Sequence, residues 1–347
     1  MNAEIDPIYL ELAAKIDGAD TEIIPRILAK LASLDQARLL KALPDRDRER
    51  SARSSFDLSE EFARKLGLDK DTLDGHIREL YQKGVVFPSK LGPQMVRNWM
   101  QMHDSTLSNP KYDDSLGNEY FDLWAASSDS RPPAQGHLHP ESAPLRVVPK
   151  WKSIEGVPGV LPFEDMRQIL KGQYPIALVP CACKRSYRKR ECGVPESSCI
   201  NVGRTAQYNL DRGVGKVMTY EEALELLEKF EQFPLVSLVI NQRDVTQAIC
   251  NCHSCCCVAH KEDALASSRF VATVDVKQCS ACGTCVARCQ FGAAQLREDP
   301  ETGGEVAYVD SDLCRGCGDC VIACPSGNVE MKLVRPLAHI PEVASVY

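Results

Sequence analysis

The pattern CxxCxxCxxxC occurs twice near the C-terminus of the chain. Its first copy is Cys279, Cys282, Cys285 and Cys289, and its second copy is Cys314, Cys317, Cys320 and Cys324. Thiolates with this spacing can bind iron, because three of them wrap around one face of an iron–sulfur cube and the fourth completes a second cube. A zinc ribbon would instead show paired CxxC knuckles. The spacing therefore predicts iron–sulfur chemistry.

The repeat resembles the bacterial two-[4Fe-4S] ferredoxin domain over about Thr273 to Val334. The resemblance implies a ferredoxin-like fold with two [4Fe-4S] clusters, in which the fourth cysteine of each motif binds the other cluster. Cluster 1 would then be held by Cys279, Cys282, Cys285 and Cys324, and cluster 2 by Cys314, Cys317, Cys320 and Cys289. Gln290 stands where the family usually has a proline, but this difference removes no ligand.

The other nine of the 17 cysteines lie in two blocks, PCACKRSYRKRECGVPESSC and ICNCHSCCC, and each block directly follows a predicted strand. They are Cys181, Cys183, Cys192, Cys199, Cys250, Cys252, Cys255, Cys256 and Cys257. Two strand ends that carry thiols side by side could assemble four or more ligands. We therefore predict one or more additional iron–sulfur clusters, with Cys181, Cys183, Cys250 and Cys252 as the preferred ligands.

Two alternatives for these nine thiols remain open. Zinc is less favoured because it rarely needs more than four ligands, and free or redox-active thiols are the other possibility. The pairing of a PCxC block with a later CNCxxCC block ahead of a ferredoxin domain is similar to that in iron–sulfur proteins of anaerobic bacteria and archaea. This resemblance supports metal binding without naming a reaction.

The overall composition favours a cytoplasmic location. The net charge is −7, the sequence pI is near 5.6, and 44% of the residues are hydrophobic. The N-terminus lacks the positive flank and apolar core of a secretory signal, and no apolar run reaches the ~18 residues of a membrane helix. So many cysteines in a cytosolic protein point to metal binding rather than to disulfides, because cytosolic thiols are kept reduced.

The distribution of cysteines divides the chain into domains, since none of them lies before Cys181. We predict an α+β multidomain protein. Its parts are a helical domain at 1–126, a Ser-, Pro- and Gly-rich linker at 127–150, a small cysteine-rich α/β domain at 151–268, and the two-[4Fe-4S] ferredoxin domain with a C-terminal tail at 269–347.

The N-terminal domain resembles a winged helix over about 80 residues. Helical periodicity at 21–43, 57–67 and 69–84 is followed by a short strand at 85–87 and a tight connection. Members of that family often bind DNA through the helix that here spans 69–83. This helix offers little attraction to phosphates, because its basic residues are balanced by acidic ones. DNA is therefore not expected as a partner, and a protein-docking or structural role is favoured.

Together these features predict an iron–sulfur electron-transfer protein that serves as a subunit of, or a dedicated donor to, a larger anaerobic redox complex. Its partner would be a redox protein or an oxidoreductase complex, and the sequence does not give the oligomeric state. We expect an electron carrier or a non-catalytic subunit rather than an enzyme. Two alternatives are an oxidoreductase that reduces a substrate or disulfide at the middle cluster, and a redox-responsive winged-helix regulator.

Overall fold

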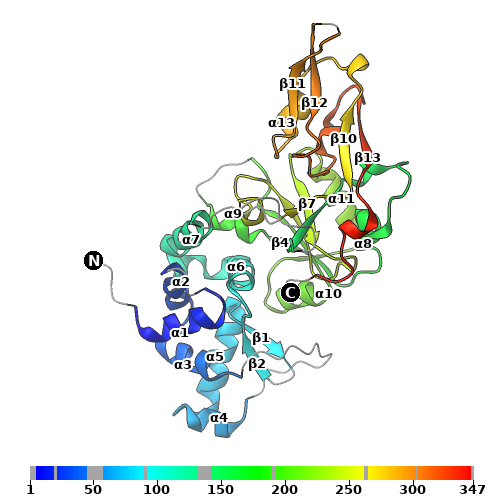
Figure 1. Ribbon diagram of the computed structural model, residues 1–347. Coiled ribbons are helices and arrows are strands. Elements are labelled where there is room, and N and C mark those ends of the chain that lie inside the picture. Colours follow the sequence, from blue (N-terminus) through cyan, green and yellow to red (C-terminus); the bar gives the residue numbers. More distant parts are fainter. Residues whose placement is uncertain are drawn as a thin grey trace. The chain divides into compact units, whose positions relative to one another are not determined.

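A computed structural model describes residues 5–18, 22–44, 58–89, 92–130, 142–188, 193–261, 265–301 and 303–344 (Figure 1). The chain forms two compact units. The first consists of Met1–Arg131, Pro180–Arg190 and Arg212–Val214, and the second of Pro132–Val179, Glu191–Asp211 and Gly215–Tyr347. Among the described residues, no helix combines the length and the apolar content that a membrane crossing requires.

The first unit is mainly helical. Its elements are α1 (Pro7–Lys15), α2 (Ile23–Leu31), α3 (Leu34–Ala42), α4 (Glu60–Lys65), α5 (Lys70–Lys83), β1 (Val86–Ser89), β2 (Gly92–Met95), α6 (Trp99–Leu107), η1 (Pro110–Tyr112), α7 (Asp113–Asp129) and α9 (Ala182–Ser186). The periodicity at 21–43 predicted one helix, but the chain forms two. Ser33 breaks the pattern because its side chain caps α3, in a capping box with Gln36.

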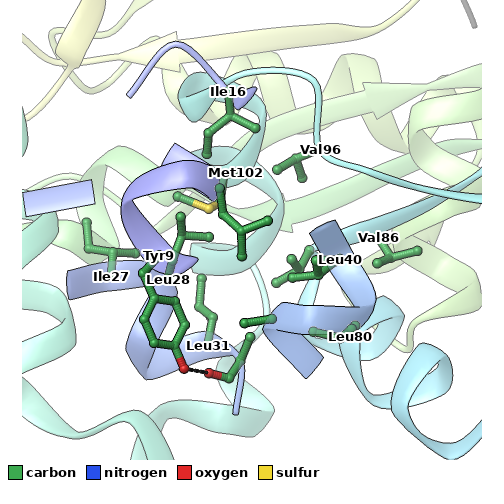
Figure 2. Packing of buried hydrophobic residues seen from close by; sticks show 14 of the residues in the cluster. Tyr9, Ile16, Ile27, Leu28, Leu31, Leu40, Leu80, Val86, Val96 and Met102 are labelled. Atoms are coloured by element: carbon green, nitrogen blue, oxygen red, sulfur yellow. Dashed lines mark hydrogen bonds between the residues drawn. The ribbon is translucent and has the colours of Figure 1, made fainter. Parts of the chain in front are cut away.

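One hydrophobic core holds this unit together. Figure 2 shows Leu28, Leu31, Leu40 and Met102 gathered among the helices, and all four side chains are almost fully buried. The hydroxyl of Tyr9 donates a hydrogen bond to the carbonyl oxygen of Ala32 at 2.8 Å. Packing of amphipathic faces, more than local propensity, stabilises helices of this length.

The hairpin of β1 and β2 follows α5 directly. Asp69 caps the start of α5, and Gly84 ends the helix with a left-handed φ of 87°. The two strands pair antiparallel from Val86↔Met95 to Ser89↔Gly92. Helices followed by a hairpin are the order that a winged helix requires, and the winged-helix assignment itself stays a prediction.

Two short segments from later in the chain pack into the first unit. Ala182 of α9 joins the hydrophobic core of the helices. Arg212 donates hydrogen bonds to the carbonyl oxygens of Gln82, at 3.1 Å, and Ser105, at 2.8 Å. Both segments fall within the range 151–268 that was predicted as the cysteine-rich domain, because such long-range contacts leave no signal in the local sequence.

The second unit is organised around a seven-stranded sheet. The strand order is β6-β4-β5-β8-β7-β3-β9. The strands are β3 (Leu145–Val148), β4 (Ile176–Pro180), β5 (Ser197–Val202), β6 (Lys216–Met218), β7 (Val236–Ile240), β8 (Ala248–Cys252) and β9 (Leu265–Ala266). The sheet includes 145–148, which the composition had placed in the linker 127–150. Residues 131–141 of that linker lie outside the described residues.

Helices cover one face of this sheet. The helical elements of the unit are η2 (Trp151–Ile154), η3 (Pro162–Glu164), α8 (Met166–Leu170), α10 (Gly203–Asp211), α11 (Tyr220–Phe230) and α12 (Val258–Lys261). Ile200, Val239 and Ile249 pack against side chains of α8 and α11. Side chains alternate between the faces of a strand, so Leu238 and Cys252 lie on the opposite face, in a separate apolar cluster.

The C-terminal part of the second unit consists of two antiparallel strand pairs and two short helices (Figure 1). Its elements are β10 (Phe270–Val274), η4 (Val276–Gln278), α13 (Thr284–Arg288), β11 (Ala294–Glu298), β12 (Glu305–Val309), α14 (Asp319–Ala323), β13 (Val329–Leu333) and η5 (Leu337–His339). β10 pairs with β13, and β11 pairs with β12. The protein is therefore a mixed α+β multidomain chain.

Candidate iron–sulfur centres

Each repeated cysteine motif is a loop that runs into a short helix. α13 begins after Gly283 and α14 after Gly318, and both glycines have left-handed φ angles, of 72° and 76°. Glycine adopts this conformation without steric cost, so the chain can turn sharply between the second and third cysteines of the motif. Cys289 and Cys324 cap the C-terminal ends of the two helices. The two motifs are thus equivalent in structure as well as in sequence.

The second motif is packed so closely that its glycines leave no room for side chains. A Cβ atom at Gly316 would lie 2.1 Å from the carbonyl oxygen of Phe270, and one at Gly318 would lie 2.0 Å from Oγ of Ser153. The backbone N–H of Lys150 donates to the carbonyl oxygen of Cys317 at 3.0 Å. Strand β10 and the start of η2 therefore hold this loop from outside.

Four cysteines line one pocket at the surface of the second motif. Three of them, Cys314, Cys317 and Cys320, come from the second motif, and the fourth is Cys289 from the first. Phe291 contributes to the wall. This combination of thiols is the one that the crossed ligand pattern assigns to cluster 2.

Burial disfavours the ionised, thiolate form of these cysteines when no cation is bound. Desolvation, reinforced by the charge of Asp319, raises the pKa of Cys317 to about 12. Burial also raises the pKa of Cys320, and the neighbouring Cys317 adds to the effect. Bound metal ions reverse this tendency, because they keep coordinating thiols deprotonated. The donor set therefore suits a cationic iron core.

Of the other four cysteines of the motifs, Cys285 is buried and the other three are at least partly exposed. The backbone N–H of Ala307 donates to Sγ of Cys279 at 3.3 Å, and Cys285 packs beside Cys279 around Ala294 and Ala307. Cys282 is exposed, and its hydrogen bonds with Thr284 lower its pKa. At Cys324, burial opposes ionisation, but hydrogen bonds from Ser326 and nearby backbone N–H groups outweigh it and lower the pKa.

The geometry of the thiols bears on which metal group could bind. Within the described part of the chain, no three Cys, His, Asp or Glu side chains are arranged to bind one ion together. A zinc site needs four donors about 2.0–2.3 Å from a single ion. In a [4Fe-4S] cube each thiolate binds its own iron, so the sulfurs must surround a volume. The cavity at Cys289, Cys314, Cys317 and Cys320 provides such a volume.

A buried acidic residue lies next to the thiols of Cys289, Cys314, Cys317 and Cys320, which are called site 2 below. Asp319 is 1% exposed and lines the cavity. Its carboxylate lies 3.4 Å from Nζ of Lys150 and 3.7 Å from the guanidinium of Arg288. Burial raises the pKa of Asp319, while Lys150 and Arg288 partly oppose this shift. Asp319 was not among the predicted site residues, although its position between Cys317 and Cys320 was an available signal.

A second concentration of thiols lies on the sheet face opposite to α8 and α11. Cys199 of β5 lies directly across from Cys250 of β8. Cys252 follows two residues later on the same face, and it contacts both Cys250 and Cys257. These two hydrogen bonds, together with burial, raise the pKa of Cys252 well above its ordinary value. The structure thus brings four of the nine remaining cysteines together.

The three consecutive cysteines Cys255, Cys256 and Cys257 lie in a tight turn, which directs their side chains differently. The carbonyl oxygen of His253 accepts the backbone N–H groups of Cys256 and Cys257, at 3.3 and 3.1 Å. The thiol of Cys256 lies 3.7 Å from the same oxygen, and the N–H of Cys255 donates to Nδ1 of His253. His253 therefore folds the turn, and Cys257 is in contact with Cys252.

Cys181 and Cys183 lie in the first unit, at the start of α9. Two of the basic residues that follow them form ion pairs. Arg185 is 5% exposed and binds the carboxylate of Asp113 at 2.6 Å, and Arg188 binds the same carboxylate. Whether Cys181 and Cys183 share a site with Cys250 and Cys252 stays a prediction, and Cys192 lies outside the described residues.

The C-terminal fold and its paired cysteine loops define a ferredoxin-type iron–sulfur domain. Residues 278–328 match the family model of 4Fe-4S dicluster domains. A comparison with curated proteins gave no significant match. A dicluster domain indicates a role in iron–sulfur electron transfer, and the remainder of the chain must be interpreted from its own residues.

Proposed function

We propose that the protein transfers single electrons through two [4Fe-4S] clusters in its C-terminal domain. Cluster 1 is held by Cys279, Cys282, Cys285 and Cys324, and cluster 2 by Cys314, Cys317, Cys320 and Cys289. The observation that carries the proposal is the cavity at which Cys289 of the first motif joins three cysteines of the second. A ferredoxin that exchanges its fourth ligands in this way places its two clusters close together.

Backbone N–H groups stabilise the negative charge that an extra electron would bring to these sites. The backbone N–H of Ala307 donates to Sγ of Cys279, and that of Ala294 donates to Sγ of Cys289 at 3.5 Å. Hydrogen bonds to thiolate sulfur stabilise negative charge and thereby set the reduction potential. When bound, the clusters supply the one-electron chemistry.

A redox partner would approach at cluster 1. Cys282 is exposed, whereas the cysteines of site 2 are buried or partly buried. Electrons would therefore enter or leave near Cys282. We propose that the protein is a subunit of, or a donor to, a larger redox complex in the cytoplasm, and that it carries an additional metal centre in the middle region.

Iron and acid-labile sulfide should be measured after anaerobic purification, together with EPR spectra of the dithionite-reduced protein. At least about eight irons are expected for two cubes. Cys289→Ala should remove the same EPR signal as Cys314→Ala, and Cys285→Ala should remove the other. If Cys289→Ala instead removes the signal that depends on Cys279, the crossed ligand assignment is wrong.

A further inference from the structure

Three thiols project from one face of the sheet in the second unit. In the antiparallel pair of β5 and β8, Cys199 lies opposite Cys250. Side chains opposite each other have Cβ atoms about 4.5–5.5 Å apart, and residues two apart on a strand share a face. Cys199, Cys250 and Cys252 therefore form a compact group that the pairing register fixes.

The turn after β8 adds a fourth thiol. Cys257 is 3% exposed and touches Cys252, which is 5% exposed. Both belong to an apolar cluster with Val236, Leu238 and Leu265. Four thiols from two strands and a turn thus lie together in one partly desolvated region, and Cys₄ ligation is the arrangement that iron–sulfur clusters use.

Two residues of the C-terminal domain separate this site from cluster site 2. Phe291 and Cys317 both line the cavity with Cys289 and Cys320. The same two residues pack against the apolar cluster that contains Cys252 and Cys257. His260 stacks on Phe291 with ring centroids 5.1 Å apart and an angle of 13° between the planes. One layer of side chains therefore lies between the two groups of thiols.

Gln290 fixes the distance across this layer. Its Oε1 accepts the backbone N–H of Ser254 at 2.5 Å, and its Nε2 donates to the carbonyl oxygen of Cys252 at 3.4 Å. The same amide nitrogen donates to the carbonyl oxygen of Pro234. Gln290 adjoins Cys289, so one side chain joins a ligand loop of site 2 to the thiol-rich turn. A proline at this position could make none of these bonds.

We propose that Cys199, Cys250, Cys252 and Cys257 hold a further iron–sulfur cluster, and that single electrons pass between it and site 2 across Phe291 and Cys317. The inference rests on the proposed function, because site 2 must hold a cluster for the transfer to occur. In each step one centre loses an electron and the other gains it, so no bond forms or breaks and no proton is required. A zinc ion at these thiols would be redox-inert and would end the path.

Iron content and EPR spectra test the proposal in the full-length protein, with dithionite as the electron donor. The wild type is expected to hold about ten to twelve irons, since a further two- or four-iron cluster adds to eight. Cys252→Ala should lower the content to about eight. It should also remove one EPR signal and the magnetic broadening that this centre imposes on the remaining signals. Cys256→Ala, in the same turn, is the matched control and should change neither.

Cys199→Ala provides a second variant on a different strand and should act like Cys252→Ala. A wild type with about eight irons, or with stoichiometric zinc, would overturn the inference while leaving the two-cluster function intact. A wild type with about four irons that all depend on Cys252 would instead contradict the proposed function of the C-terminal domain. Unchanged spectra in both Cys199→Ala and Cys252→Ala would exclude these thiols as ligands.

Discussion

The side chain of Gln290 accepts the backbone N–H of Ser254 at 2.5 Å, and so connects the ferredoxin-type domain to the thiol-rich turn. From the sequence alone, Gln290 was only a departure from the proline that the family usually has. The structure provides a physical reason for this departure, because a side-chain amide can bind backbone groups of the turn on both its oxygen and its nitrogen.

Replacing Gln290 by leucine should loosen this connection without removing a ligand. The partly buried backbone groups at Ser254 and Pro234 would lose their partner, which costs up to about 1–3 kcal/mol of unfolding free energy. Iron content should stay at the wild-type level, whereas the magnetic broadening between the centres should weaken. Urea unfolding and EPR spectroscopy measure the two effects.

Gln278→Leu is the matched control for this change. Gln278 precedes Cys279 as Gln290 follows Cys289, but it is exposed and its Nε2 binds Asp275 at 2.9 Å. The control should retain both wild-type stability and wild-type spectra. Equal behaviour of the two leucine variants would show that Gln290 does not join the two sites.

Asp319→Asn should raise the reduction potential of cluster 2. The buried carboxylate lies beside Cys317 and Cys320, and its negative charge opposes the arrival of an electron. Removing one charge a few ångströms away at an effective dielectric constant near 20 predicts an increase on the order of 100–200 mV. Redox titration followed by EPR at about pH 8 measures it. Asp312→Asn, at an exposed position near Cys314, should leave the potential nearly unchanged, and an equal shift in both variants would rule out a specific effect of Asp319.

Gly316→Ala should reduce iron incorporation at site 2. The new Cβ atom would overlap the carbonyl oxygen of Phe270, and alanine would also be strained at a φ of 68°. Gly303→Ala separates the two causes, because Gly303 has a φ of 71° but no atoms within 4 Å of its Cβ position. Iron analysis should show a loss of up to about four irons for Gly316→Ala and none for Gly303→Ala. Full iron content in Gly316→Ala would show that the loop tolerates displacement.

Local chemistry in the sequence predicted much of the C-terminal domain. The cysteine spacing predicted the ferredoxin-type domain, which the family model matches at 278–328, and the glycines at 283, 316 and 318 permit its tight loops. The capping residues Asp69 and Thr219 likewise lie where α5 and α11 begin. These signals act over a few residues, so they can be read without knowledge of the fold.

Contacts between distant segments could not be predicted in this way. The pairing of Cys199 with Cys250 depends on the register of β5 and β8, which lie about 50 residues apart. Arg185 lies in a run of basic residues, yet it is buried because Asp113 and the carbonyl oxygen of Leu107 provide partners. Strand β3 lies in a segment whose composition resembles that of a linker. In each case the tertiary partner, rather than the local sequence, determines the outcome.

Arg269→Met should strongly destabilise the second unit. Arg269 is 7% exposed and binds the carboxylate of Glu164, itself 1% exposed, at 3.0 Å. Removing one partner of a buried ion pair leaves the other charge uncompensated, which costs about 3–5 kcal/mol. The exposed pair of Lys332 and Glu330 is the control, and Lys332→Met should cost less than about 1 kcal/mol. Chemical unfolding measures both, and equal small losses would show that Arg269 is dispensable.

Tyr120 should make the first unit less stable at alkaline pH. Its hydroxyl donates to Oγ1 of Thr106 at 2.6 Å, and burial raises its pKa to about 12. Below the unfolded-state pKa near 10, the phenol is neutral in both states and has no effect on pH dependence. Between about pH 10 and pH 12 only the unfolded chain ionises. Stability therefore falls as the pH rises, by up to about 3 kcal/mol.

Tyr120→Phe should remove this part of the pH dependence. Urea unfolding at about pH 9 and about pH 11.5 should show a smaller loss of stability in the variant than in the wild type. A residual loss is expected from Tyr9 and Tyr112, because burial raises their pKa values as well. Tyr174→Phe, at a side chain that is 85% exposed, should keep the wild-type dependence. If Tyr120→Phe loses as much stability as the wild type over this interval, the phenol of Tyr120 already ionises in the folded protein.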